Sequence, residues 1–318
     1  DSGALTVWST SSGQNISTMQ ETGSWIYALA VSPDGATLFS GDDSGTLTVW
    51  STSSEQKINT MHSVSRIFTL AVSPDGTTVY SGDQHGALIA WSTSSGQKIN
   101  TMQEKGAIGS YIFSLAVSPD GATLFSGDAS GTLTAWSTRS GHKINTMQEK
   151  GSWIYALAVS PDGATLYSGD EKSALTGGAL TAWSTSFGQK INTMQATGST
   201  IATLAVSPDG ATLFSGDYSG ALTVWSISSG QKINTMQEKG SSIRTLTVSP
   251  DGTTLFSGAQ NGALTEWSTS SGQKINTMQE TGSYILTLAV SPDGATLFSG
   301  NGNGALAEWS TSSGQKIS

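Results

Sequence analysis

An internal repeat runs through the whole chain of 318 residues and governs how it can fold. The string Ser-Pro-Asp-Gly occurs seven times, at intervals of 41 to 47 residues, and it contains every proline of the chain. Its aspartates are Asp34, Asp75, Asp120, Asp162, Asp209, Asp251 and Asp293. Repeats of this length are supersecondary units that bury their apolar residues only by stacking on their neighbours. The sequence therefore predicts one repeat array over residues 1–318, and not two separate domains.

Each unit has the pattern of four short strands. In the first complete unit, residues 25–32 form a β-branched and aromatic run that ends at Ser32-Pro33-Asp34-Gly35, which has the proline and glycine positions of a type I turn. Residues 36–41 predict the second strand, and residues 46–51 alternate apolar and polar side chains, as a half-buried strand does. Residues 57–61 predict the fourth and most polar strand, which suits the outer edge of a sheet.

A lysine begins this predicted fourth strand in seven places. The lysines are Lys57, Lys98, Lys143, Lys190, Lys232, Lys274 and Lys316. A charge on an exposed strand edge suppresses edge-to-edge pairing between molecules, and we expect this protective role for them.

A third recurring string ends each predicted third strand with Trp-Ser. Its tryptophans are Trp8, Trp50, Trp91, Trp136, Trp183, Trp225, Trp267 and Trp309. With 38 glycines and only 12 % charged residues, the composition is unlike that of a helical protein. Four-stranded units of about 42 residues bury both sheet faces when they stack radially. We therefore predict an all-β fold, a seven-bladed β-propeller with four antiparallel strands per blade.

The repeat length, the Ser-Pro-Asp-Gly turn and the tryptophan that ends the third strand resemble the WD40 repeat family. The resemblance covers nearly the whole chain and implies a WD40-type propeller. Members of that family typically carry a Gly-His pair before the first strand, an aspartate six residues before the tryptophan and another after it. Here serine stands in place of the histidine, as at Ser24 and Ser152, and serine always follows the tryptophan. The family's buried His–Asp–Ser/Thr–Trp network is therefore expected to be absent in its usual form.

The two ends of the chain hold one third-type strand more than seven blades need. Residues 3–9 and 304–310 are both copies of that strand, and each is followed by part of a fourth strand. Residues 1–22 therefore either close the ring beside residues 301–318 or pair with a neighbouring molecule by strand addition. In WD40 propellers an N-terminal strand completes the C-terminal blade, so the resemblance implies closure of the ring.

No catalytic, cofactor or metal site is predicted. The chain has no cysteine, and His62, His85 and His142 lie in three different predicted loop types without metal-ligand spacing. Turn formation is sufficient to explain the seven aspartates of the turns. The chain has neither a phosphate-binding glycine loop nor a nucleophile elbow. We therefore expect a protein that is not an enzyme.

The repeats differ from one another mainly at the start of the first strand and in the hairpin between the second and third strands. Length changes fall in the same loop types, near residues 62–65, 107–109 and 171–177. In a propeller whose first strand is innermost, both places lie around the mouth of the central channel. Aromatic residues with arginine are typical hot spots of protein interfaces. The candidate partner-binding residues are Trp25, Tyr27, Arg66, Phe68, Tyr111, Phe113, Trp153, Tyr155, Tyr218, Arg244 and Tyr284.

The leading interpretation is a non-enzymatic scaffold that binds a protein or peptide through this aromatic-rich face, a role that the WD40 resemblance also implies. Packing between blades is the competing explanation for Tyr27 and its equivalents. Two other functions stay open: a self-assembling structural protein joined through its terminal strands, and a glycan-binding propeller lectin. The net charge of −9 argues against nucleic acid and membrane surfaces as partners. The compartment is left open, with the cytoplasm slightly favoured over secretion.

Overall fold

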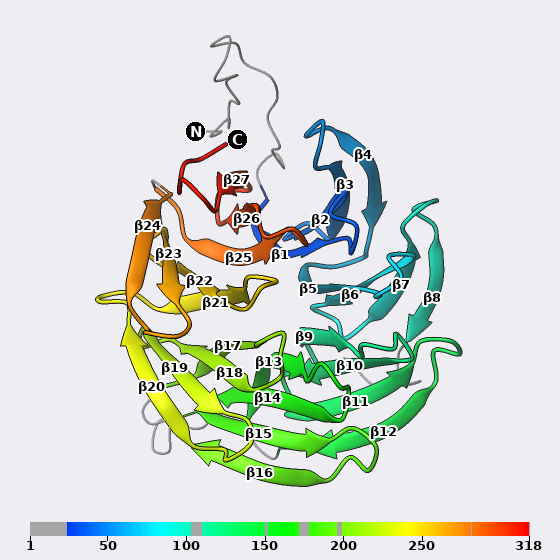
Figure 1. Ribbon diagram of the computed structural model, residues 1–318. Helices are drawn as coiled ribbons and strands as arrows, with labels where there is room; N and C mark the ends of the chain where they lie inside the picture. The colour runs from blue at the N-terminus through cyan, green and yellow to red at the C-terminus, as the bar shows by residue number, and fades with distance from the viewer. Residues whose placement is uncertain are drawn as a thin grey trace.

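The computed structural model describes residues 24–102, 110–149, 152–171, 178–195, 199–280 and 282–317. These residues form 27 strands and no helix. The strands make seven antiparallel sheets around a common centre, and Figure 1 shows them as the blades of a ring. The predicted all-β, seven-bladed propeller is therefore confirmed.

Strands of the same order within their blades are equivalent. The innermost strands are β1 (Ile26–Val31), β5 (Ile67–Val72), β9 (Ile112–Val117), β13 (Trp153–Val159), β17 (Ile201–Val206), β21 (Ile243–Val248) and β25 (Ile285–Val290). The second strands are β2 (Thr37–Asp42), β6 (Thr78–Asp83), β10 (Thr123–Asp128), β14 (Thr165–Glu171), β18 (Thr212–Asp217), β22 (Thr254–Ala259) and β26 (Thr296–Asn301). The third strands are β3 (Thr46–Ser51), β7 (Leu88–Ser92), β11 (Thr132–Ser137), β15 (Ala179–Ser184), β19 (Ala221–Ser226), β23 (Ala263–Ser268) and β27 (Leu306–Ser310). The outer strands are β4 (Lys57–His62), β8 (Lys98–Met102), β12 (Lys143–Gln148), β16 (Lys190–Gln195), β20 (Lys232–Gln237) and β24 (Lys274–Gln279).

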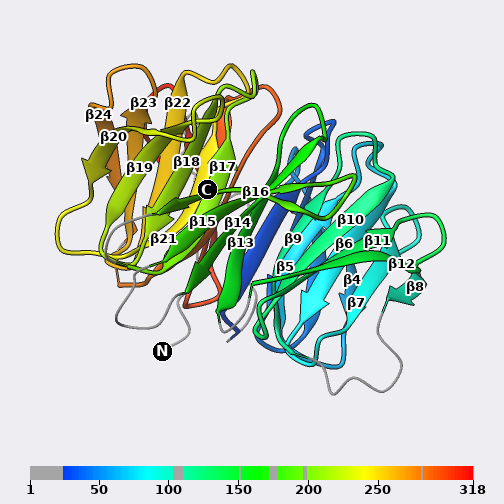
Figure 2. The ribbon, with the colours of Figure 1, turned by 90° about the horizontal axis from the view of Figure 1, so that it is seen from below.

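The order of strands within a blade follows the order of the chain. Blade one is the sheet β1-β2-β3-β4, and blades two to six repeat this order. Figure 2 shows blade four from its outer side, with β16 in front of β15 and β14. The Ser-Pro-Asp-Gly turn joins the first two strands: in blade one, the amide of Gly35 donates to the carbonyl oxygen of Ser32 over 2.8 Å. The carboxylate of Asp34 accepts hydrogen bonds from the Ser32 hydroxyl and the Ala36 amide, as expected for a turn aspartate.

The recurring tryptophan packs in the core between its own blade and the preceding one. Trp50 is 2 % exposed, and its indole Nε1 donates to the Ser40 hydroxyl on β2 over 2.8 Å. The same bond joins the tryptophan of the third strand to a serine of the second strand in all seven blades. A single Trp–Ser hydrogen bond therefore satisfies the buried indole N–H group, whereas the WD40 family uses a longer network of side chains.

Neighbouring blades interlock at a glycine of the second strand. A Cβ atom at Gly127 would lie only 2.5 Å from Cγ2 of Ile154 in the next blade, so the backbone of one blade lies directly against the isoleucine of the next. The same approach recurs between blade seven and blade one, at Gly300 and Ile26. At that junction the amide of Leu29 also donates to the Thr287 hydroxyl over 3.0 Å. The innermost strands therefore form a closed ring.

The outer lysines do more than protect an edge, because three of them form ion pairs with a glutamate that follows the outer strand of the preceding blade. The Nζ–Oε2 distances are 2.7 Å for Lys190–Glu149, 3.1 Å for Lys274–Glu238 and 3.0 Å for Lys316–Glu280. Four lysines also lie over the tryptophan ring of their own blade, at 5.0 to 5.4 Å from the ring centroid. Lys190, Lys274 and Lys316 therefore connect adjacent blades.

Blade seven has three strands among the described residues, β25-β26-β27. The third-type copy at the C-terminal end, β27, pairs with β26, and one isolated bridge joins Trp309 to Lys316 beyond it. The predicted strands within residues 1–22 lie outside the described residues.

Candidate interaction face

The starts of the innermost strands and the hairpins between second and third strands lie on one face of the ring, which we call the channel-mouth face. Backbone hydrogen bonds fix the two places together. The amide of Asp43 donates to the carbonyl of Trp25 over 3.0 Å, and Ala129 donates in the same way to Tyr111 over 3.0 Å. The two places where the repeats diverge in sequence are therefore neighbours in space.

Eight of the predicted residues form a continuous series of ring contacts on this face. We call this series the aromatic arc; its members are Trp25, Tyr27, Phe68, Tyr111, Phe113, Trp153, Tyr155 and Tyr218. The arc crosses from blade to blade: the ring centroids are 5.5 Å apart for Tyr27 and Phe68, and 5.3 Å apart for Phe68 and Phe113. The arc therefore extends over blades one to five.

The aromatic arc has an inner and an outer layer. Tyr27, Phe68, Phe113 and Tyr155 are half-buried and contact one another's rings or their neighbours' rings across the blades. Packing between blades therefore accounts for part of this inner layer. The outer layer consists of Trp25, Tyr111 and Trp153, whose side chains are exposed to solvent by 46 %, 40 % and 45 %.

The two predicted arginines lie against the aromatic arc. The guanidinium carbon of Arg66 lies 5.4 Å from the centroid of Tyr27 and forms an ion pair with Asp43. Arg244 lies 4.6 Å from the centroid of Tyr218, and its Nη2 donates to Gln260 Oε1 over 2.8 Å. Cation–π contacts of this kind hold both a cation and a ring in place.

Burial shapes the electrostatics of the tyrosines on this face. Desolvation, reinforced by the nearby Tyr218 and Glu171, raises the pKa of Tyr155 well above its usual range. Its hydroxyl lies 3.4 Å from Glu171 Oε2 as a hydrogen-bond donor. The pKa of Tyr218 is also raised, again chiefly by burial. Both phenols are therefore neutral at physiological pH.

Tyr284 lies apart from the arc, beside a cavity of about 370 Å³ whose other aromatic wall is Trp25. The remaining lining residues are polar or small: Gln260, Asn261, Gly282, Ser283, Gly302 and Asn303. Sequence comparison between the repeats identified the variable hairpins but not this cavity, because its walls come from blades six, seven and one.

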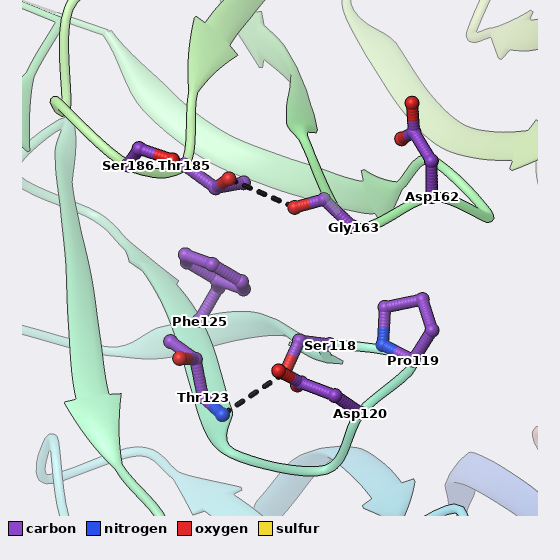
Figure 3. A pocket seen from close by; sticks show the side chains of 9 residues that line it. All are labelled: Ser118, Pro119, Asp120, Thr123, Phe125, Asp162, Gly163, Thr185 and Ser186. Atoms are coloured by element: carbon purple, nitrogen blue, oxygen red, sulfur yellow. Dashed lines mark hydrogen bonds between the residues drawn. The ribbon is translucent and has the colours of Figure 1, made fainter.

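The opposite face of the ring, formed by the Pro-Asp-Gly turns, holds pockets between blades that sequence reasoning missed. The pocket between blades three and four has a volume of about 570 Å³ and is drawn in Figure 3. Phe125 lies between two bonded turns: Thr185 donates to the Gly163 carbonyl over 2.8 Å, and the Thr123 amide donates to Ser118 Oγ over 2.9 Å. Hydrogen bonding by Ser118 lowers the pKa of Asp120, which lines the same pocket.

Within the described ranges, no group of three histidine, cysteine, aspartate or glutamate side chains is placed to hold a metal ion. Nor does any helix of sufficient length and apolarity to cross a membrane occur in this part of the chain.

Comparison with protein families gives two matches. Residues 49–278 match the family model described as outer membrane protein assembly factor BamB, and residues 13–51 match the model described as WD domain, G-beta repeat. A search of curated proteins found no match to the chain. Because the first match spans well over half of the 318 residues, the chain belongs to the propeller family of that model, and it carries the WD-type repeat that its sequence resembles.

Proposed function

We propose that this propeller is a non-enzymatic scaffold that binds a protein or peptide through the aromatic arc of its channel-mouth face. The propeller fold and both family matches are consistent with a protein-interaction scaffold. The observation that carries the proposal is the arc itself, an uninterrupted series of ring contacts from Trp25 to Tyr218 with an exposed outer layer.

The two layers of the arc suit binding energetically. Exposed tryptophan and tyrosine rings supply large contact areas, and such residues dominate the binding energy of many interfaces. The half-buried rings beneath them limit their motion, so less conformational entropy is lost when a partner is bound. Because Arg66 is already paired with Asp43, we expect the arc to recognise apolar and aromatic side chains in preference to acidic ones.

The asymmetry of the face favours a peptide over a repeated glycan. Blades one to four carry aromatic rings at the innermost position, whereas blades five, six and seven carry Ala202, Arg244 and Leu286. A lectin with equivalent sites would keep the same groups in each blade. A single extended segment that crosses blades one to four fits the asymmetric arrangement better.

The test is a selection of peptides from a displayed random library on the wild-type protein, followed by affinity measurements with variants. We expect Trp25→Ala combined with Trp153→Ala to weaken a selected peptide by at least about tenfold, as the loss of hot-spot residues does. Phe187→Ser is the matched control, because Phe187 is an exposed aromatic residue in a turn between third and outer strands, where other repeats have serine. Equal affinity of both variants for every selected peptide would refute the proposal.

A further inference from the structure

Two pockets on the face of the Pro-Asp-Gly turns contain an acidic residue that the other blades lack. Glu266 on β23 and Glu308 on β27 stand immediately before the recurring tryptophan of their blades. The equivalent residues of the other blades are small and apolar: Val49, Ala90, Ala135, Ala182 and Val224. The pocket drawn in Figure 3 has no such glutamate, because the residue before the recurring tryptophan of blade three is Ala135.

The pocket between blades seven and one has a volume of about 450 Å³. Glu308 lines it together with the turn carboxylates of Asp34 and Asp293 and the ring of Phe298. The pocket between blades six and seven, of about 520 Å³, repeats this arrangement with Glu266, Asp251, Asp293, Phe256 and Ile275. Each pocket therefore combines an apolar wall with several carboxylates, and among the described residues no basic side chain lines either pocket.

Both glutamates are buried without full hydrogen bonding. Glu266 is 4 % exposed and Glu308 is 6 % exposed, and Oε1 of each has no hydrogen-bond partner within the described part of the chain. A buried polar atom without a partner loses its hydrogen bonds to water and gains none in return, so each unpaired oxygen points to a missing donor. Burial and the nearby Glu55 raise the pKa of Glu308 to about 8, which shows that its negative charge is poorly compensated.

Glu55 gives the pocket between blades seven and one a further distinctive feature. Its backbone has a left-handed φ of 57°, and it is the one non-glycine residue of the described chain with a positive φ. The equivalent residues of the other blades are glycines: Gly96, Gly141, Gly188, Gly230, Gly272 and Gly314. A glutamate in this conformation is strained, and its charge acts directly on Glu308.

We propose that these two pockets bind a small organic cation, a primary amine whose ammonium group donates to the glutamate carboxylate and whose alkyl chain lies along the phenylalanine wall. An ammonium group supplies three donors, and its positive charge lowers the pKa of the adjacent carboxyl group, so that Glu308 releases its proton to solvent when the amine binds. A bare metal ion fits less well, because no group of three carboxylates in the described residues is placed to coordinate one. The proposal concerns the face opposite the aromatic arc and does not depend on the proposed function.

The test is isothermal titration calorimetry with 1,4-diaminobutane, with butane-1,4-diol as the uncharged probe of similar length. We expect two diamine sites per chain in the wild type and no binding of the diol. The isosteric variants Glu308→Gln and Glu266→Gln should each remove one site or weaken it at least about tenfold. The Asp120→Asn control changes a carboxylate of the pocket without a buried glutamate and should leave both sites intact.

Thermal unfolding of each variant checks that it is folded before its binding is compared. Absence of diamine binding to the wild type, or equal binding by the double Glu→Gln variant, would overturn the proposal. Binding of the diol with the affinity of the diamine would also overturn it, because the sites would then recognise chain length and not charge.

Discussion

At the residue scale, the Trp–Ser pair explains how each blade is held without the longer WD40 network. The indole ring of Trp50 packs in the core between blades one and seven, where its cluster includes Phe298 and Leu306, and its N–H group donates to Ser40. We expect Trp50→Ala to lower the free energy of unfolding by roughly 3–5 kcal/mol, the usual range for a buried tryptophan. Ser40→Ala should lower it by about 1–3 kcal/mol, since it only removes the partner of a buried donor. Denaturant unfolding measures the free energy of unfolding of both variants. If Trp50→Ala lowered it by less than Ser40→Ala does, the Trp50 ring would not be part of the core.

Glu308 predicts a specific dependence of stability on pH. Its pKa is about 8 in the folded protein, against an ordinary value of 4.5, because of burial and the charge of Glu55. Asp34 and Asp293 line the same pocket and add no positive charge. Between these two pH values the folded state holds a proton that the unfolded state has released, so stability falls as the pH rises from about 4.5 to 8.

Removing this carboxylate should flatten the pH dependence. At about 1.4 kcal/mol per pKa unit, the loss attributable to Glu308 is on the order of 4–5 kcal/mol at pH 8 and above. We expect Glu308→Gln to match the wild type near pH 4 and to be more stable than it at pH 8. Thermal melting across this range measures the difference, and parallel curves for the two proteins would refute it.

At the scale of elements, contacts between a second strand and the next innermost strand set the spacing of the blades. A Cβ atom at Gly127 would lie 2.5 Å from Ile154 Cγ2 and 2.7 Å from Ser114 Oγ. We therefore expect Gly127→Ala to destabilise the protein by about 1–3 kcal/mol through overpacking. Gly302→Ala is the control, because a Cβ there meets its nearest atom at 3.4 Å. Equal unfolding midpoints for the two variants would contradict this packing.

The strands and their turns could be predicted from the sequence because they depend on local patterns. The predicted strands at residues 36–41, 46–51 and 57–61 each lie within one residue of β2, β3 and β4. Proline and glycine positions fix the intervening turns, and alternation fixes which side chains are buried. The starts of the innermost strands and the variable hairpins could also be assigned to one face, because consecutive antiparallel strands of a blade bring these two places to the same end.

Contacts between blades could not be predicted in this way. The ion pair between Lys190 and Glu149 joins residues 41 positions apart, and the sequence showed only a lysine on an edge. The pockets with Glu266 and Glu308 are lined from two blades each, so no single repeat contains their pattern. The three-dimensional stacking of the blades is needed to bring these groups together.

At the scale of the whole molecule, the inner ring is closed but the outer edge of blade seven involves the chain ends. Lys316 and Ile317 already pair with Trp309 and Glu308 at the edge of β27. We propose that residues 18–21 continue this outer strand, because their Thr-Met-Gln copies the end of Lys-Ile-Asn-Thr-Met-Gln in the other outer strands. The ion-pair pattern of the other blades would then match Glu21 with Lys57. This arrangement completes seven four-stranded blades within one chain.

Removal of residues 1–22 tests this arrangement of the ends. We expect the shortened protein to form concentration-dependent dimers through the exposed edge of β27, as unprotected strand edges do, and to melt at a lower temperature. Removal of residues 1–10 alone should leave a monomer. Native mass spectrometry over a wide concentration range measures both. Oligomers of the full chain that vanish when residues 1–10 are removed would instead support self-assembly through the terminal strands.

A hydrogen-exchange footprint of a selected peptide on the full chain decides whether the aromatic arc is the interaction face. We expect slower exchange at the starts of β1, β5, β9 and β13 and in the adjoining hairpins, with the Pro-Asp-Gly turns unchanged. Slower exchange confined to those turns, or to the outer strands, would place the partner elsewhere and refute the assignment of the binding face.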